Sequence, residues 1–337
     1  MADNKITGSD AKRNRTYAEI RAERDGKKPQ AGSVLPTQKK ESWIRSLIYA
    51  GLIAFIIRTF FFEAFRIPSG SMKNTLLVGD HLFVNKIGYF IETPKYIPFT
   101  SIKIPHLHLK TWAVNRGDVV IFEYPGDQDE VVPREQKVNY IKRCIGLPGD
   151  TIQIRNKQVY VNGKIYPNPP ESILQNDTEK AGTVDAGIFP HGAHWNKDNY
   201  GPIEIPKTGD VIPVNKDNID RWQVFIEREG HKVELGMNDQ ITIDGKAVTE
   251  YKVEHDYLWM MGDNRDNSLD SRFWGFAPMD NVVGSGLIVY WSWYNPPFST
   301  ISEDDGYDSH PGPEGPDFPE ESQSFHTRWD RIGKLVH

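Results

Sequence analysis

Three short segments hold the residues whose types and spacing could do chemistry: PSGSM at residues 68–72, YIKRCIGLPGD at 140–150, and MGDNRDNSLDSRFWGF at 261–276. The first places Ser71 in a tight turn, the second places Lys142 within an apolar strand pattern, and the third is a loop dense in small polar groups. No histidine or cysteine stands where a serine nucleophile would need one for activation. A serine activated by a lysine is one of the few ways to build a hydrolytic nucleophile without imidazole. The three segments together therefore indicate a Ser–Lys hydrolase.

Each of these residues also has an ordinary structural explanation. A serine in a Pro-Ser-Gly-Ser turn is usually only a loop residue. Lys142 and Arg143 are neighbours in an alternating strand, so we expect one of the two cations to point inward; the alternative is a lysine on the exposed face of an edge strand. In the third segment, Arg265 and Ser271 occupy positions that an EF-hand calcium loop needs for other residues. We interpret this segment as a tight loop fixed by local hydrogen bonds, with Ser268 free to contact a neighbour.

The composition limits the remaining functions. The 337 residues can form one large domain or two ordinary ones, and the formal charge of −6 argues against nucleic acid as a partner. The single cysteine, Cys144, excludes an internal disulfide and every multi-thiolate metal site. His106 and His108 could share one strand face and bind a metal ion, but the sequence offers no third ligand. We therefore expect neither a metal nor a cofactor.

Residues 43–65 (WIRSLIYAGLIAFIIRTFFFEAF) form the segment that predicts a transmembrane helix. At ~1.5 Å per residue they would extend about 34 Å, enough to cross a ~30 Å hydrocarbon layer. Arg58 and Glu63 lie near one end of the segment, where they could reach the interface. More lysines and arginines precede the segment than follow it, which predicts a cytosolic N-terminus and an external position for everything after residue 65. The alternative is a buried amphipathic helix.

β patterns dominate after this segment. Runs rich in Val, Ile, Phe and Tyr predict strands over residues 81–85, 118–124, 138–145, 151–155 and 158–161. Asn162-Gly163 and Asp244-Gly245 predict hairpin turns, and apolar residues at helical spacing predict one helix within 218–230. The expected fold is mainly β: an antiparallel-sheet catalytic region with an inserted accessory lobe, preceded by a single N-terminal transmembrane helix.

We expect seven regions along the chain. They are a polar cytoplasmic tail (1–42), the transmembrane helix (43–65), the first part of the catalytic β region (66–164), the accessory lobe (165–250), the second part of the catalytic region (251–296), an acidic loop rich in Pro and Gly (297–325), and a C-terminal segment that returns to the core (326–337). The lobe shows no obvious catalytic cluster. Residues 328–336 regain apolar character, which predicts an edge element of the sheet.

The three segments, in this order and behind a membrane span, closely resemble bacterial type I signal peptidase, a Ser–Lys dyad family. The resemblance covers roughly residues 42–165 and 251–295 with the extreme C-terminus, and it includes RGDVVIF at 116–122. It implies that Ser71 is the nucleophile and Lys142 the general base. It also implies that Ser69 gives a hydroxyl to the oxyanion hole and that Ser268 hydrogen-bonds and orients Lys142.

The same resemblance implies pockets for the small side chains of the substrate. The matching residues are Phe65, Ile67, Met72, Leu76, Tyr140 and Ile141. Asp270 and Arg272 are expected to support the site structurally. Asn74 stands where we expect a proline, which would loosen the turn without removing a catalytic group. Lysine at its ordinary pKa of ~10.4 is almost wholly charged at neutral pH, so the role of Lys142 requires that burial lower its pKa.

The activity implied by this resemblance is the removal of N-terminal signal peptides from exported preproteins after a small-x-small sequence. The reaction would take place on the outer face of the bacterial cytoplasmic membrane, with membrane lipid and the export translocon as neighbours. Two alternatives share parts of the pattern. A self-cleaving regulator uses the same Ser–Lys chemistry but would be soluble and bind DNA, and a membrane-tethered binding protein could retain a dead site.

Overall fold

The computed structural model describes residues 24, 26, 43–87, 89–92, 108–110, 113–133, 136–236, 239–294 and 326–336. The chain divides into two units, Met1–Ile53 and Ala54–His337. The expected acidic loop, most of the expected polar tail, His106 and the side chain of His108 lie outside what is described. Two short strands, β3 (Phe90–Glu92) and β4 (His108–Lys110), pair with each other in this part of the chain.

Helix α2 (Trp43–Phe60) is shorter than the expected helix over residues 43–65. Residues from Phe62 onward instead form strand β1 (Phe62–Arg66), which pairs antiparallel with β2 (Asp80–Asn85). The expectation is wrong at this end because the sheet takes up the backbone hydrogen bonds of an aromatic-rich stretch that favours strands equally well. Exposed apolar side chains lie on every side of α2 between Trp43 and Ile57. Among the described residues, no helix combines the length and the apolar character needed to cross a membrane.

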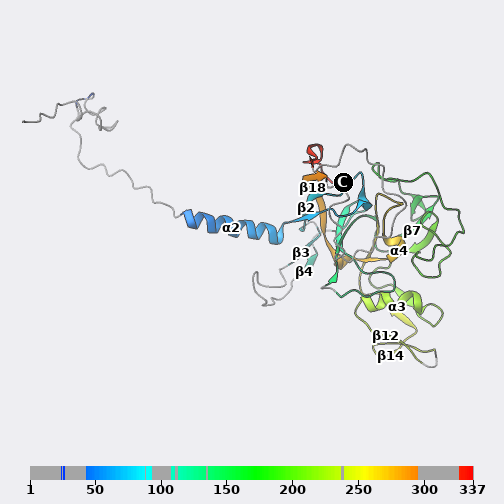
Figure 1. The fold of residues 1–337 in the computed structure, drawn as a ribbon. Helices are drawn as coiled ribbons and strands as arrows, with labels where there is room; N and C mark the ends of the chain where they lie inside the picture. The colour runs from blue at the N-terminus through cyan, green and yellow to red at the C-terminus, as the bar shows by residue number, and fades with distance from the viewer. Residues whose placement is uncertain are drawn as a thin grey trace, which may run out of the picture. The chain divides into compact units, whose positions relative to one another are not determined.

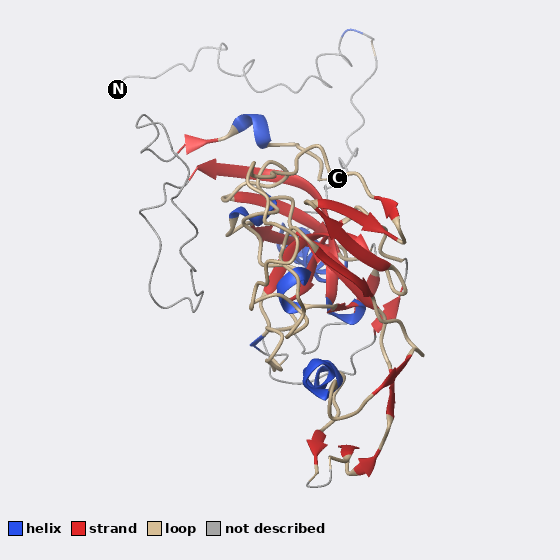
Figure 2. Ribbon diagram, turned by 90° about the vertical axis from the view of Figure 1, so that its right-hand side faces the viewer, coloured by secondary structure: helices blue, strands red, loops and turns tan. Residues whose placement is uncertain are grey.

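An eight-stranded antiparallel sheet forms the centre of the second unit (Figure 1). Its strands run in the order β1-β2-β18-β5-β6-β16-β17, with β19 paired to β18. The remaining bounds are β5 (Val119–Glu123), β6 (Asn139–Gly146), β16 (Tyr257–Met261), β17 (Ala277–Pro278), β18 (Val282–Tyr294) and β19 (His326–Thr327). Figure 2 shows these strands curling around the interior rather than lying flat. The predicted mainly β architecture is confirmed.

The strands expected from apolar runs are confirmed to within one or two residues. The runs over 81–85, 118–124 and 138–145 correspond to β2, β5 and β6. The next two form β7 (Thr151–Arg155) and β8 (Gln158–Val161), which belong to a second sheet with β9 (Lys164–Ile165) and β10 (Tyr200–Glu204). Asn162-Gly163 joins β8 to β9 with φ values of 52° and 74°, as a two-residue hairpin turn requires.

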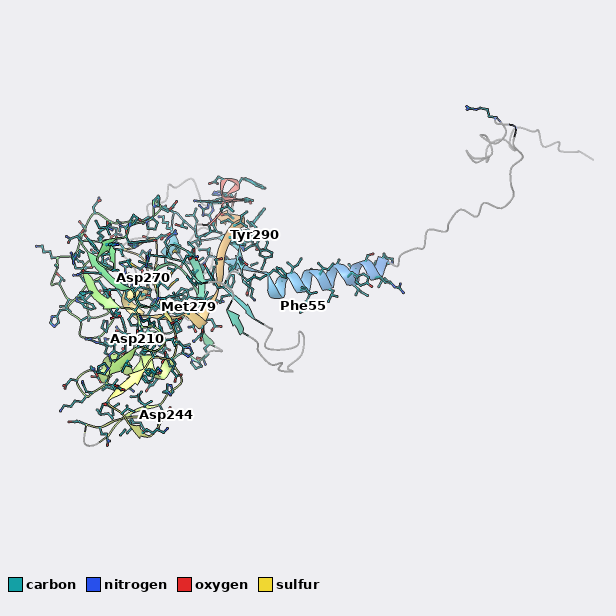
Figure 3. All side chains as sticks on the ribbon, turned by 180° about the vertical axis from the view of Figure 1, so that it is seen from behind. Phe55, Asp210, Asp244, Asp270, Met279 and Tyr290 are labelled. Carbon is teal, nitrogen blue, oxygen red and sulfur yellow. The ribbon has the colours of Figure 1, made fainter. Side chains whose placement is uncertain are left out.

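The accessory lobe contains one helix and two small sheets. Helix α3 (Ile219–Arg228) lies within the segment that predicts it. Strand β11 (Val211–Pro213) pairs with β15 (Glu250–Lys252), and β12 (Val233–Leu235), β13 (Ile241–Ile243) and β14 (Lys246–Ala247) form a three-stranded sheet. Figure 3 labels Asp244, which lies in the turn between β13 and β14, and it labels Asp270 and Met279 among the packed side chains of the central region. One buried apolar cluster joins the lobe to the central sheet. It contains Ile226 of α3, Ile145 of β6 and Trp259 of β16.

The C-terminal segment returns to the central sheet, as predicted. His326 and Thr327 pair with Tyr294 and Trp293 at the end of β18. A short turn of 3₁₀ helix, η6 (Trp329–Arg331), follows. The Arg331 guanidinium then donates hydrogen bonds to Asp80 at 2.5 Å and to the carbonyl of Thr75 at 2.9 Å. This end of the chain therefore contacts the turn that follows Ser71.

Candidate active site

Ser71 lies in one turn of 3₁₀ helix, η2 (Gly70–Met72), between β1 and β2. Hydrogen bonds between Ile67 and the residues Gly79 and Asp80 close the loop that contains this turn. The Ser71 side chain is buried and Met72 beside it is fully buried. The apolar neighbour thus fixes the turn against the core, while the serine hydroxyl faces the strands opposite.

Lys142 lies in the middle of β6, between β5 and β16, and 4% of it is exposed. Its Nζ donates a hydrogen bond to Ser71 Oγ at 2.7 Å. The two residues are 71 positions apart in the chain, so the fold alone brings them together. The structure therefore joins the two residues that the sequence predicts as nucleophile and base.

Burial lowers the pKa of Lys142 from 10.5 to about 8. Asp270 and Asp263 oppose this shift by favouring the charged amine, and Arg272 reinforces it. A lysine with such a pKa is partly neutral near physiological pH, unlike an ordinary exposed lysine. The neutral amine can accept the hydroxyl proton of Ser71 across the same 2.7 Å contact.

Arg143 is buried as well, which corrects the expectation that only one of the two cations points inward. Its guanidinium binds Asp263 with two hydrogen bonds, of 2.9 and 2.7 Å, and donates a third, of 2.7 Å, to Gly117 O. The curled sheet is covered on both faces here, and a paired carboxylate compensates the buried charge. The alternation of residues along β6 predicts that Lys142 and Arg143 lie on opposite faces of the sheet. It does not predict that other parts of the chain cover both faces.

Residues 261–270, which we call the catalytic loop, hold the Ser71 turn in place. Asn264 donates its backbone N–H to Ser71 O at 3.0 Å and its side-chain amide to Gly70 O at 3.1 Å. Asp263 accepts a hydrogen bond of 2.5 Å from the Thr75 hydroxyl. The expected local hydrogen bonds are present, for example from Asn267 N–H to Asn264 O at 3.0 Å, and the loop bonds the distant Ser71 turn as well. Asn264 and Asp263 were not predicted as site residues. One indication of their contacts was present in the sequence: this segment has more polar groups than the hydrogen bonds of a single turn require.

Ser268 lies next to the Ser71 turn but does not hydrogen-bond Lys142. Its Oγ is buried and has no hydrogen-bond partner within the described part of the chain. Gly262 lies between Ser268 and the backbone of Ser71. A Cβ at Gly262 would lie 2.2 Å from Ser268 Oγ and 2.6 Å from Ser71 O. Only glycine lets Ser268 and the Ser71 backbone approach this closely. A buried hydroxyl without a partner is unusual in a native protein.

Asp270 and Arg272 form a fully buried ion pair behind the catalytic loop. Their two hydrogen bonds are both 2.8 Å long. Asp270 also accepts from the N–H of Gly262 at 3.1 Å and caps the short helix α4 (Ser271–Trp274). These contacts fit the structural support expected of the two residues, because they fix both ends of the loop that carries Ser268.

The predicted substrate-pocket residues divide between two neighbouring apolar clusters. Ile67, Met72, Leu76 and Ile141 belong to one, with Phe65 packed against it. Tyr140 packs against the other, where its ring stacks on Tyr124 with centroids 4.3 Å apart. Lys142 Nζ lies 5.2 Å from the centre of the Tyr140 ring. Both clusters thus reach the Ser71–Lys142 pair.

Ser69 and Asn74 flank the nucleophile turn. Ser69 is exposed, and its Oγ lies 3.4 Å from Ser71 Oγ. Asn74 has a φ of 75°, a backbone conformation that proline cannot adopt. Its side chain donates to Glu171 O at 3.2 Å, and its own carbonyl accepts from Lys334 at 3.3 Å. Asn74 is therefore anchored on two sides in this turn.

The sequence profile described as "Signal peptidase, peptidase S26" matches residues 40–291, which include every site residue described above. The chain belongs to this family. Among curated relatives it is 34% identical to Signal peptidase I of Buchnera aphidicola subsp. Schizaphis graminum over 258 residues, or 74% of each chain. It is 30% identical to that of Pseudomonas aeruginosa over 263 residues (74% of this chain, 72% of the relative) and 32% identical to that of Helicobacter pylori strain J99 over 267 residues (74% and 81%). Membership of this family makes the chain a serine peptidase of the signal peptidase type.

Proposed function

We propose that this peptidase removes N-terminal signal peptides from exported preproteins, with Ser71 as the nucleophile and Lys142 as the general base. The observation that carries the proposal is the 2.7 Å hydrogen bond between Lys142 Nζ and Ser71 Oγ in a buried setting. A pKa of about 8 for Lys142 supports it, because a base must be partly deprotonated to act.

The reaction proceeds in two halves on the same pair of residues. Neutral Lys142 accepts the proton of Ser71, and Ser71 Oγ attacks the scissile carbonyl. The protonated amine then gives its proton to the leaving amine, which leaves an acyl-enzyme. In the second half Lys142 activates the water that releases the acyl group.

Ser69 and Ser268 have supporting roles in this proposal. The Ser69 hydroxyl, beside the N–H of Ser71, stabilises the negative oxygen of the tetrahedral intermediate; one such donor contributes about 10²–10³ in rate. The Ser268 hydroxyl has no hydrogen-bond partner among the described residues. When substrate is bound, it hydrogen-bonds the Lys142 amine and orients it. The 3.4 Å distance between the Ser69 and Ser71 oxygens supports the first role.

Specificity for small residues follows from the apolar clusters at the site. Ile67, Met72, Leu76 and Ile141, with Phe65 and Tyr140 beside them, admit Ala, Ser or Gly before the cut and exclude larger side chains by steric overlap. The enzyme would therefore cleave its substrates after a small-x-small sequence.

The proposed location is the bacterial cytoplasmic membrane, with the N-terminus in the cytoplasm and the catalytic region on the outer face. The support is α2, which is apolar on every side and follows a stretch rich in lysine and arginine. Preprotein signal peptides, membrane lipid and the export translocon are then its neighbours. Protease added outside intact spheroplasts should leave residues 1–42 protected; digestion of that tail first would contradict this orientation.

The decisive experiment is cleavage of one purified preprotein by the full-length protein in detergent. Wild type should cleave it at a single small-x-small site, and Ser71→Ala should not. Lys216→Arg serves as a matched control for handling of the variants, because Lys216 is exposed and its ion pair within the described residues is with Asp239 on the lobe surface. Equal cleavage by Ser71→Ala and wild type would overturn the assignment, and no cleavage by either would favour a binding protein with a dead site.

A further inference from the structure

Lys157 is a second buried lysine, separate from the catalytic pair. It lies in the tight turn between β7 and β8, and 8% of it is exposed. Both turn residues have left-handed backbone, with φ of 48° at Asn156 and 66° at Lys157. The next hairpin places Asn162-Gly163 in the same conformation, and glycine is favoured there because it lacks a Cβ. A lysine at such a position is strained, which indicates that its side chain is needed.

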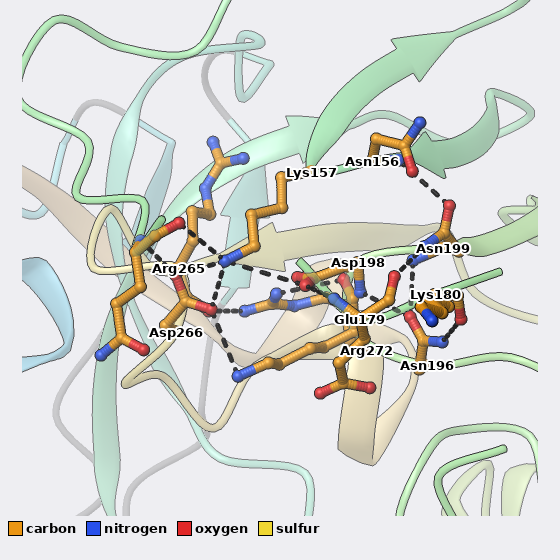
Figure 4. Close-up of polar contacts among 12 residues, drawn as sticks. Asn156, Lys157, Glu179, Lys180, Asn196, Asp198, Asn199, Arg265, Asp266 and Arg272 are labelled. Atoms are coloured by element: carbon orange, nitrogen blue, oxygen red, sulfur yellow. Dashed lines mark hydrogen bonds and ion pairs between the residues drawn. The ribbon is translucent and has the colours of Figure 1, made fainter. Parts of the chain in front are cut away.

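The Lys157 side chain reaches the catalytic loop. Its ammonium contacts both carboxylate oxygens of Asp266, at 3.0 and 3.2 Å (Figure 4). The Asp266 side chain is 3% exposed, and the residue lies two positions before Ser268. Although burial raises it, the pKa of Asp266 is held below its ordinary value by hydrogen bonds from Gln175 N–H, Lys157 and Lys197. The contact is therefore a buried ion pair that joins the catalytic loop to the turn between β7 and β8.

The accessory lobe completes this support. Ile173 N–H donates to Asp263 O at 2.9 Å, and Ile173 O accepts from Arg265 N–H at 3.1 Å. Gln175 donates its N–H to Asp266 at 2.8 Å and accepts at its carbonyl from Lys157 at 3.1 Å. A strand-like stretch of the lobe thus runs along the catalytic loop, and Lys157 is bonded to both.

We propose that Lys157 is a positioning residue for the peptidase reaction. Through Asp266 it fixes the catalytic loop, and thereby sets where Asn264 holds the Ser71 turn and where Ser268 packs against Gly262. The inference rests on the proposed function, because it assumes that Ser71 and Lys142 carry the reaction. It gives the lobe a role that the sequence did not indicate: its 173–175 stretch is part of the support of the active site.

Replacement of Lys157 by Met tests the inference in the full-length enzyme. We expect kcat to fall about 10²-fold, because a displacement of ~1 Å at reacting groups has an effect of this order, and KM to change by less than about threefold. The pH limb assigned to Lys142 should move to higher pH, because a looser loop admits water to an amine whose pKa is lowered mainly by burial. Asp270, Asp263 and Arg272 are the charged groups that face this amine.

Three further variants separate positioning from folding. Lys157→Arg keeps the charge and the donors, so it should keep kcat within about threefold of wild type. Lys197→Met removes a cation that contacts the same carboxylate at 3.2 Å but is partly exposed, so its effect should also be within about threefold. The double variant Lys157→Met/Asp266→Asn removes the Asp266 charge together with its closest cation, so that of the two carboxylates near Lys157 only Asp198, 3.7 Å away, keeps its charge; it should fold and lose as much kcat as Lys157→Met.

Hydrogen exchange gives a readout that does not depend on activity. The amides of Asn264 and Arg265, which bond Ser71 O and Ile173 O, should exchange faster in Lys157→Met than in Lys197→Met. Wild-type kcat and an unmoved pH limb in a folded Lys157→Met or double variant would overturn the inference. So would a loss that is uniform with pH and tracks the folded fraction, or failure of both variants to fold, because Lys157 would then serve folding alone. Activity of Ser71→Ala would instead overturn the proposed function, and the two failures are thereby distinguished.

Discussion

Two buried lysines in this protein have opposite surroundings. Lys142 contacts a serine hydroxyl at 2.7 Å and an aromatic ring, and no carboxylate oxygen is within hydrogen-bonding distance of its Nζ among the described residues. Lys157 contacts both oxygens of the Asp266 carboxylate and lies 3.7 Å from Asp198. Within the described residues, the Lys142 amine has no carboxylate in contact, whereas the Lys157 amine has the carboxylates of Asp266 and Asp198 nearby.

Under the proposed function, this difference in surroundings separates the lysine that acts as a base from the lysine that positions a loop. Burial without a bonded carboxylate disfavours the charged amine, and for Lys142 this lowers the pKa to about 8. Burial against a carboxylate instead produces a fixed ion pair, which holds two chain segments together. A perturbed pKa in contact with a nucleophile therefore marks the functional lysine.

Exchange of each lysine for arginine should give the largest contrast. Arg at position 142 keeps the charge but cannot deprotonate, so Lys142→Arg should lose at least about 10⁴-fold in kcat. Lys157→Arg, which can keep a paired cation against Asp266, should stay close to wild type. Cleavage of one preprotein by both purified variants provides the measurement. Appreciable turnover by Lys142→Arg would remove Lys142 as the base.

Replacement of each lysine by Met should change stability in opposite directions. Lys142→Met removes an amine whose charge is disfavoured by burial, so at pH 7 the free energy of unfolding should rise by about 1–3 kcal/mol. Lys157→Met removes the closest cation of the Asp266 carboxylate and should lower the free energy of unfolding by about 1–3 kcal/mol, less than for a buried charge left with no cation, because Lys197 remains 3.2 Å away. Denaturant unfolding of both variants and wild type measures these changes. A loss of stability of similar size in both variants would contradict the difference that we infer between the two lysines.

The pH dependence of cleavage should show a limb that belongs to Lys142 alone. The pKa of this amine in the folded protein is lowered from 10.5 to about 8, so the neutral form is populated as pH rises toward 8. The rate should increase about tenfold per pH unit below that value and level off above it. Initial rates between about pH 6 and 10 measure the limb. A midpoint near 6.5 would point to histidine instead.

Much of the site was predictable because its residues lie in contiguous motifs. The motifs and the family resemblance pointed to Ser71 and Lys142, which the fold brings into contact, and β2, β5, β6, β7 and β8 follow the apolar runs that predict them. The C-terminal return to β18 was also anticipated. The end of helix α2 was misplaced, because residues 62–66 have an aromatic-rich sequence compatible with helix or strand and pairing with β2 decides between them.

The contacts that the sequence could not indicate are those between distant segments. Asn264 bonds Ser71, Lys157 bonds Asp266, and both faces of β6 are covered, so that Arg143 is buried along with Lys142. Each of these depends on how strands separated by many residues curl over one another, and no local periodicity encodes such a distance. The sequence by itself determined the chemistry on offer: a serine, a lysine without histidine, and a polar loop. Only the tertiary structure decided which lysine lacks a carboxylate partner, because that depends on which side chains the fold buries together.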